Sequence, residues 1–173
     1  MEVAKDGLAV IVHPDNPVRD LTLEQIRGLY TAETANWNGL GGRDARVHII
    51  AREEGSGTRS AFESLVMNGL EISPRAIVQD SNGAVRQLVA GDRYAVGFIS
   101  LGLVDDTVRA VRLAGVAATG DNIINGSYSL YRPFLFVTRE PPDGRVKAFI
   151  DFTLSREGQA VLRHEGLIPR VDG

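Results

Sequence analysis

The segment Arg-Glu-Glu-Gly-Ser-Gly-Thr, which begins at Arg52, holds the residues best suited to chemistry in this sequence. Gly55 and Gly57 allow a tight turn whose backbone N–H groups can face a single point. Ser56 and Thr58 add hydroxyl donors, and Arg52 adds a planar fork able to donate two parallel hydrogen bonds to an oxyanion. These residue types at this spacing predict a turn that binds a tetrahedral oxyanion.

Glu54 bears on which oxyanion the turn would accept. A carboxylate repels an anion unless that anion carries a proton for the carboxylate to accept, and phosphate has such a proton near neutral pH whereas sulfate has none. The local pattern is equally compatible with Ser56 capping a helix while Arg52 and Glu54 form a surface ion pair. It fits neither a Walker loop, because no Lys follows the second glycine, nor a G-x-S-x-G elbow, because Glu54 replaces the first glycine.

Regular elements on both sides are expected to position this segment. The β-branched run Leu8–Val12 predicts a strand buried on both faces, as in a parallel sheet. Val47–Ala51 predicts a strand that ends directly before Arg52, and apolar spacing over 59–67 predicts the helix that follows. Since open α/β sheets bind ligands at the carboxyl ends of their strands, the segment lies where a ligand is expected.

The strand–helix alternation continues along the chain. Thr22, with Gln25 three residues later, predicts a capped helix. Asn82 lies at the next strand-to-helix turn, where it would either reach the same anion site or simply belong to the start of the helix. The other predicted elements are strands at 76–78, 94–100, 108–113 and 131–138, a helix at 81–90, a loop at 120–127, and a C-terminal helical region from 146 with a break near Ser155.

Composition excludes several classes of function. The 173 residues carry a formal net charge of -3 without a Lys/Arg cluster, which opposes nucleic-acid binding, and they include no cysteine for thiolate chemistry or disulfides. No apolar run is long enough to predict a membrane span. The histidines lack the spacing of metal ligands, so neither a metal nor a cofactor is expected; they are His13, His48 and His164.

The sequence also resembles a known family, the substrate-binding proteins of phosphate-specific transporters. The resemblance extends over almost the whole chain. Its motifs are DGLAVIVHPDNPV (6–18), LTLEQIRGLYTAETANW (21–37), REEGSGTRSAF (52–62), SNGAVRQLV (81–89), VGFISLG (96–102), YRPF (131–134) and FIDFTLSREGQ (149–159).

This resemblance implies a fold and a site. The implied fold class is α/β, with a periplasmic-binding-protein-like (type II) lobe whose mixed sheet is flanked by helices, plus an incomplete first lobe. In the family, the arginine and the Ser-Gly-Thr turn of the second lobe grip phosphate, which corresponds to Arg52, Ser56, Gly57 and Thr58. The family's carboxylate two residues after the arginine, which accepts the phosphate's proton, corresponds to Glu54.

The chain departs from the family at its start, where the first ligand-binding segment of the first lobe is lacking. We therefore expect residues 18–100 to form a complete second lobe, and residues 1–17 and 101–173 to form crossover strands and the remnant of the first lobe. Incomplete enclosure predicts weak binding, and an open sheet edge predicts a homodimer or a partner chain that supplies the missing lobe.

The resemblance implies a solute-binding component that delivers phosphate to an ABC permease, and not an enzyme. It implies a periplasmic or extracellular location, although a chain that starts naturally at Met1 without a signal peptide would stay in the cytoplasm. Three alternatives stay open: a truncated non-transport sensor or interaction module, a binder of another oxyanion such as tungstate or molybdate, and a hydrolase in which His48 or Glu54 activates Ser56.

Overall fold

A mixed sheet forms the body of the protein, and the computed structural model describes residues 1–170 of the chain. Strand β3 pairs in parallel with β4 and β5, whereas β1 runs antiparallel to β5 and β6. The predicted mixed α/β class is confirmed. The order is β4-β3-β5-β1-β6, with bounds Ile77–Gln79, His48–Arg52, Ala95–Ser100, Glu2–Val12 and Arg109–Ala110.

The prediction of parallel neighbours for Leu8–Val12 is wrong. The run is buried on both faces, as expected, but its register matches Leu8 with Ser100 and Val12 with Val96 in an antiparallel pair. Apolar side chains on both faces follow from burial on both faces, which a central antiparallel strand experiences as well as a parallel one. The apolar run therefore indicates that the strand is buried, but it does not indicate whether its neighbours are parallel or antiparallel.

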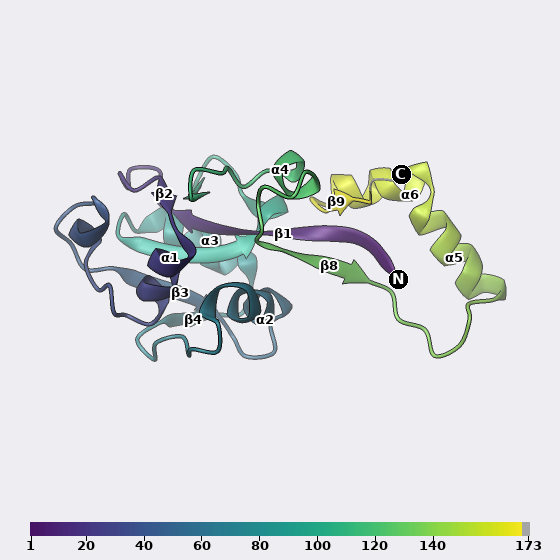
Figure 1. Cartoon of the computed structure of the whole chain (residues 1–173), viewed down its shortest axis with the longest axis horizontal. Coiled ribbons are helices and arrows are strands. Elements are labelled where there is room, and N and C mark those ends of the chain that lie inside the picture. The colour runs from purple at the N-terminus through teal and green to yellow at the C-terminus, as the bar shows by residue number, and fades with distance from the viewer. Residues whose placement is uncertain (171–173) are drawn as a thin grey trace.

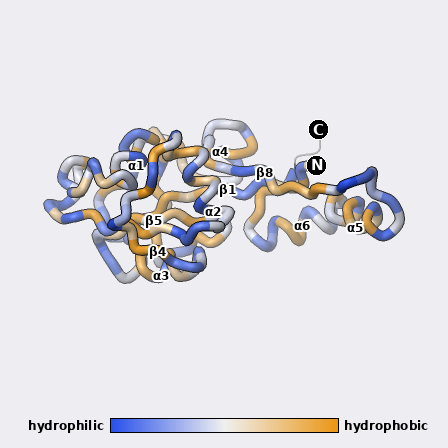
Figure 2. The backbone as a smooth tube through the Cα atoms, turned by 90° about the horizontal axis from the view of Figure 1, so that it is seen from below, coloured by the Kyte–Doolittle hydropathy of each residue, from blue (hydrophilic) through white to orange (hydrophobic). Residues whose placement is uncertain are grey.

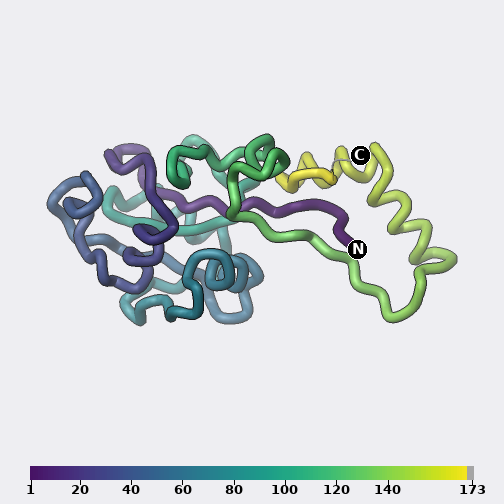
Figure 3. Tube along the Cα trace, in the orientation of Figure 1, coloured from purple at the N-terminus to yellow at the C-terminus, as the bar shows by residue number. Residues whose placement is uncertain are grey.

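Strand β1 is longer than its apolar run and belongs to two parts of the molecule. Its first half pairs antiparallel with β8 (Tyr131–Leu135) and β9 (Ile168–Pro169), while its second half lies in the main body. Figure 1 shows β1 and β8 running side by side out of the body toward α5 and α6. The tube in Figure 3 shows the same pairing of the first residues with a segment more than 120 positions later in the sequence.

Helices cover the sheet and confirm most of the predicted caps. Thr22 and Gln25 form the predicted capping box of α1, and Ser81 caps α3. Helix α2 continues directly into the π-helical turn η2. These elements span Leu23–Tyr30 (α1), Trp37–Leu40 (η1), Gly57–Phe62 (α2), Glu63–Met67 (η2), Asn82–Gly91 (α3) and Leu101–Leu103 (η3).

The C-terminal third contains one correction. Residues 120–127 do not form only a loop, because Gly120–Ile124 is helix α4, whose start is capped by the Thr119 side chain. The expected break at Ser155 is confirmed, since it separates α5 (Gly144–Leu154) from α6 (Arg156–His164). The predicted strand at 108–113 is split into β6 and β7 (Arg112–Leu113), and β7 pairs in parallel with β2 (Asp20–Leu21).

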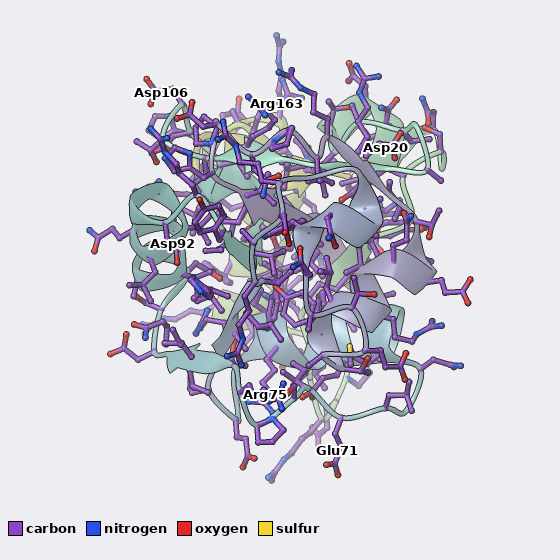
Figure 4. All side chains as sticks on the ribbon, turned by 90° about the vertical axis from the view of Figure 1, so that its left-hand side faces the viewer. Asp20, Glu71, Arg75, Asp92, Asp106 and Arg163 are labelled. Atoms are coloured by element: carbon purple, nitrogen blue, oxygen red, sulfur yellow. The ribbon has the colours of Figure 1, made fainter. Side chains whose placement is uncertain are left out.

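Apolar side chains fill the body, while one end of the molecule stays less well covered. Trp37 is buried and donates its indole N–H to the carbonyl of Tyr94 at 2.8 Å. Figure 2 shows further hydrophobic segments along β8 and in α5, outside the body. Charged side chains such as Asp106, Arg163 and Glu71 lie at the periphery (Figure 4). Among residues 1–170, no helix combines the length and the apolar character needed to cross a bilayer.

The contact that ties α2 to the sheet is aromatic. The rings of Phe62 on α2 and Phe98 on β5 stack with centroids 4.1 Å apart and planes 6° from parallel, and Tyr30 packs against both. All three side chains are fully buried. This cluster fixes the helix that follows the Ser-Gly-Thr turn.

We expect Phe62→Ala to lower the free energy of unfolding by about 3–5 kcal/mol, because it leaves a cavity beneath α2. Phe149→Ala on α5 is the matched control, since that ring is 60% exposed, and it should cost about 1 kcal/mol or less. Urea unfolding followed by circular dichroism measures both changes. Equal losses in the two variants would contradict the assigned packing.

Candidate functional site

The candidate site lies at the carboxyl end of β3, in the turn that leads into α2. Strand β3 ends at Arg52 and α2 begins at Gly57, and β3 is flanked by the two strands with which it runs parallel. Gly55 has a φ of +86°, a left-handed conformation that is strained for residues with a side chain. The predicted strand, glycine turn and helix are confirmed here, and together they place the turn at the sheet edge where α/β folds bind ligands.

Arg52 is held by a set of contacts that fixes its guanidinium group. Its Nε and Nη2 donate to the two carboxylate oxygens of Glu53, each at 2.9 Å, and Nη2 also donates to the carbonyl of Asp80 at 3.2 Å. Nη1 donates to Oδ1 of Asn82 at 3.0 Å. Its side chain is only 11% exposed, so the arginine is buried with its charge compensated. One N–H of Nη1 is left for a ligand, since an arginine has five N–H donors.

The predicted partner of Arg52 therefore changes. The surface ion pair between Arg52 and Glu54 does not form; Glu53 instead takes the Nε–Nη2 edge of the guanidinium group. Glu54 is exposed and lines a neighbouring cleft together with Arg59 and Glu63, which pair with each other. The role of Glu53 was not recognised in the sequence; its adjacency to Arg52 was the available signal.

Asn82 is brought to the site, as one of its two predicted roles requires. Its side chain accepts from Arg52, while the capping of α3 is performed by its neighbour Ser81, whose hydroxyl accepts from the N–H of Ala84. Asn82 thus links the start of α3 to the end of β3. It acts on the arginine and so orients the donor that would face a ligand.

The Ser-Gly-Thr turn holds donors that have no acceptor within residues 1–170. Ser56 and Thr58 are each 5% exposed. The Ser56 oxygen caps α2 by accepting from the N–H of Arg59 at 3.2 Å, which leaves its own O–H free to donate. The hydroxyl of Thr58 and the backbone N–H groups of Gly57 and Thr58 make no hydrogen bond in this part of the chain. Unpartnered donors grouped in one turn are suited to an anion that accepts from several of them.

The arrangement needed for a serine hydrolase is not brought together. His48 is at the start of β3 and pairs with Asp92 at 2.6 Å, whereas Ser56 follows the opposite end of that strand. Residues 1–170 hold no group of three His, Asp or Glu side chains placed to bind a metal ion.

Comparison with known proteins assigns the family. Residues 1–157 match the model of the PBP superfamily domain, and the chain belongs to this superfamily. Within it, the chain belongs to the family of phosphate ABC transporter substrate-binding proteins, as two solved relatives show. One, from Clostridium perfringens and solved with bound phosphate, is 44% identical with a TM-score of 0.90; the alignment covers 99% of this chain and 71% of that one.

The second solved relative is an ABC-type phosphate transport receptor from Vibrio cholerae, 38% identical with a TM-score of 0.89, aligned over 98% of this chain and 72% of the other. The phosphate-binding protein PstS of Bacillus subtilis is 30% identical over 173 residues, which cover 99% of this chain and 57% of that protein. The chain thus spans little more than half the length of this curated relative. The similarity to the predicted family is confirmed.

The pKa of the Glu53 carboxyl is lowered from its ordinary value of 4.5, first by the side-chain hydrogen bonds from Arg52, then by a backbone hydrogen bond and by the charges of Arg52 and Arg59. A carboxyl with a depressed pKa stabilises the fold above its unfolded pKa, and this contribution is lost as the pH falls through the folded value.

We expect Arg52→Gln to return the Glu53 pKa toward 4.5, and Arg59→Gln to move it less. Carbon-detected NMR titration of the side chain measures both; an unmoved pKa in Arg52→Gln would contradict the pair.

Proposed function

We propose that this chain binds inorganic phosphate at the turn between β3 and α2. The observation that carries the proposal is the pairing, on one short segment, of Arg52, fixed by Glu53 and Asn82 at the end of β3, with the unpartnered hydroxyl of Thr58, a residue only 5% exposed. Charge-assisted hydrogen bonds from such fixed donors are the strong interactions available to an oxyanion. The relative from Clostridium perfringens, solved with bound phosphate, supports phosphate as the anion.

The proposed ligand-binding residues are Arg52, Ser56, Gly57 and Thr58, with Asn82 acting through Arg52. Gly57 contributes its backbone N–H, and the absence of a side chain there leaves room for the guanidinium group of Arg132 against the turn. The sequence predicted two parallel hydrogen bonds from Arg52 to the oxyanion, but Arg52 has only one N–H left to donate to a ligand. The arginine would contact phosphate end-on through Nη1, and the hydroxyls and backbone N–H groups would supply the other bonds.

Glu54 is proposed as the carboxylate that accepts the phosphate's proton. Within residues 1–170 it makes no hydrogen bond or ion pair, so it can turn toward an anion without losing a contact. Both oxygens of Glu53, by contrast, already accept from Arg52. A free carboxylate beside the turn would favour an oxyanion that carries a proton over one that does not.

We further propose that the chain acts as part of a substrate-binding protein that lies outside the cytoplasm and delivers phosphate to an ABC permease in the membrane. The names of the relatives as transporter components support this role. The end formed by β8, α5 and α6 exposes apolar side chains, which supports a covering segment such as the one by which the relatives are longer. These side chains are Phe134, Leu135, Val137, Val146, Phe149, Phe152 and Val161.

Titration calorimetry of the chain with phosphate at neutral pH should show saturable heat, and Arg52→Gln should weaken binding by about 100-fold or more. The expected loss reflects a charge-assisted hydrogen bond together with a Glu53 charge left beside the anion. Arg93→Gln is the matched control, because Arg93 forms an exposed pair with Asp15 at the opposite end of β5, and it should bind as the unsubstituted chain does.

Light scattering on the same sample measures the molar mass of the chain in solution. If the apolar end formed by β8, α5 and α6 normally lies under a further segment, the chain without that segment should form a dimer or a larger species. Absence of heat at millimolar phosphate in the unsubstituted chain would reject phosphate binding by this chain. In that case the alternative of an interaction module would be favoured.

The contribution of Glu54 is tested by selectivity. We expect Glu54→Gln to reduce the ratio of phosphate to sulfate affinity by about 10-fold, because the amide can donate to an unprotonated oxyanion that the carboxylate repels. Glu53→Gln should instead weaken both anions together, since it releases Arg52 from its fixed position. The two titrations are compared at the same pH; an unchanged ratio in Glu54→Gln would remove it from the site.

A further inference from the structure

A second arginine, Arg132 on β8, is fixed with unusual completeness for a side chain at the edge of a sheet. Its Nε and Nη2 donate to the same Asp6 oxygen, Oδ2, at 3.0 and 2.8 Å. The other oxygen, Oδ1, accepts from the hydroxyl of Ser100 at 2.5 Å. The Asp6 side chain is 7% exposed and that of Arg132 is 31% exposed. Arg132 is therefore anchored on its Nε–Nη2 side by a buried carboxylate.

The remaining nitrogen, Nη1, reaches the Ser-Gly-Thr turn. A Cβ placed on Gly57 would collide with Nη1 of Arg132, so the guanidinium lies directly against this glycine. Gly57 has an ordinary φ, which means that the close approach of Arg132, and not the backbone conformation, is what a side chain there would disturb. Nη1 makes no hydrogen bond in the described part of the chain.

Two arginines that each keep a free N–H donor thus lie at one turn. Arg52 approaches from β3 and Arg132 from β8, and the turn between them carries the unpartnered hydroxyl of buried Thr58. Two guanidinium groups near one turn repel each other unless carboxylates or an anion compensate their charges. Asp6 and Glu53 each pair with the Nε–Nη2 edge of their arginine, which leaves an N–H on each Nη1 without an acceptor among residues 1–170.

We propose that Arg132 is a direct ligand of the phosphate, donating Nη1 to one of its oxygens. This inference rests on the proposed function. It adds a ligand from the strand pair β1–β8, which connects the body to the α5–α6 end, so that the anion would join the two parts of the molecule. It also assigns Asp6 and Ser100 as positioning residues that hold Arg132 in place.

The test replaces the buried ion pair as a unit. Arg132→Gln alone leaves the Asp6 carboxylate buried without its partner, which would destabilise the fold. The double variant Asp6→Asn with Arg132→Gln removes both charges, preserves the net charge and allows the two amides to hydrogen bond. We expect calorimetry with inorganic phosphate to show binding roughly 10-fold to 100-fold weaker in the double variant, the loss of one charge-assisted donor. Arg93→Gln serves again as the control.

A measurement on the unsubstituted chain avoids dependence on any variant's folding. The side-chain N–H resonances of Arg132, followed by NMR during addition of inorganic phosphate, should shift with the same saturation curve as the calorimetric heat. Saturable heat with unshifted Arg132 resonances, or with unchanged affinity in the double variant, would overturn this inference and leave the proposed function intact. Absence of heat in the unsubstituted chain would overturn both.

Discussion

The burial of one carboxylate, Asp6, determines how the two parts of this molecule join. A charge taken out of water costs several kcal/mol unless it is paired and hydrogen bonded, so a strand that carries Asp6 through the interior needs specific partners there. Ser100 at the end of β5 and Arg132 on β8 supply them. Since Asp6 lies two residues before Leu8, these bonds lie where β1 leaves the body to pair with β8. Apolar packing could tolerate small shifts at this junction, but a buried carboxylate that accepts two N–H groups on one oxygen and a hydroxyl on the other restricts them.

The same logic of local compensation explains how a protein of net charge -3 can present donors to an anion. Arg52 is paired with Glu53 and Arg132 with Asp6, so each cation is neutralised by its own carboxylate and still keeps a free N–H group. An anion arriving there meets oriented donors at short range, where the field depends on dipoles and nearest charges more than on the sum over the molecule. Net charge is consequently a poor guide to this kind of site.

The elements of the body could be predicted because their signals are local. Thr22 with Gln25, and Ser81 before α3, form caps that only neighbouring residues determine, and the buried strands β3 and β5 have apolar runs of their own. The start of β1 was not predicted because polar and apolar residues are mixed there, and its strand conformation depends on β8. The helix α4 was also missed, although Thr119 offered a cap, because glycine, aspartate and asparagine in its sequence indicated a loop.

The candidate site was predicted in position but not in its connections. The Ser-Gly-Thr turn and Arg52 are contiguous in sequence, so their proximity required no knowledge of the fold. The link from Arg52 to Asn82 spans 30 residues and that from Arg132 to Asp6 spans 126, and both follow only from sheet pairing. The identity of the carboxylate on Arg52 was missed for another reason. Within a strand, adjacent side chains point to opposite faces, so neighbours do not pair with each other. Because β3 ends at Arg52, Glu53 lies outside the strand and its carboxylate can fold back onto Arg52.

Enclosure is the remaining physical variable at this site. The donors that converge on the turn come from β3, α2 and β8, all on one side of where an anion would lie. Hydrogen bonds gain strength as water is excluded, and a site open on its other side keeps water in competition for both the donors and the anion. The α5–α6 end exposes apolar side chains while carrying the strand that holds Arg132, so a segment that covers this end would also constrain β8. A segment that covers the apolar surface would therefore also strengthen anion binding, because both effects act through strand β8.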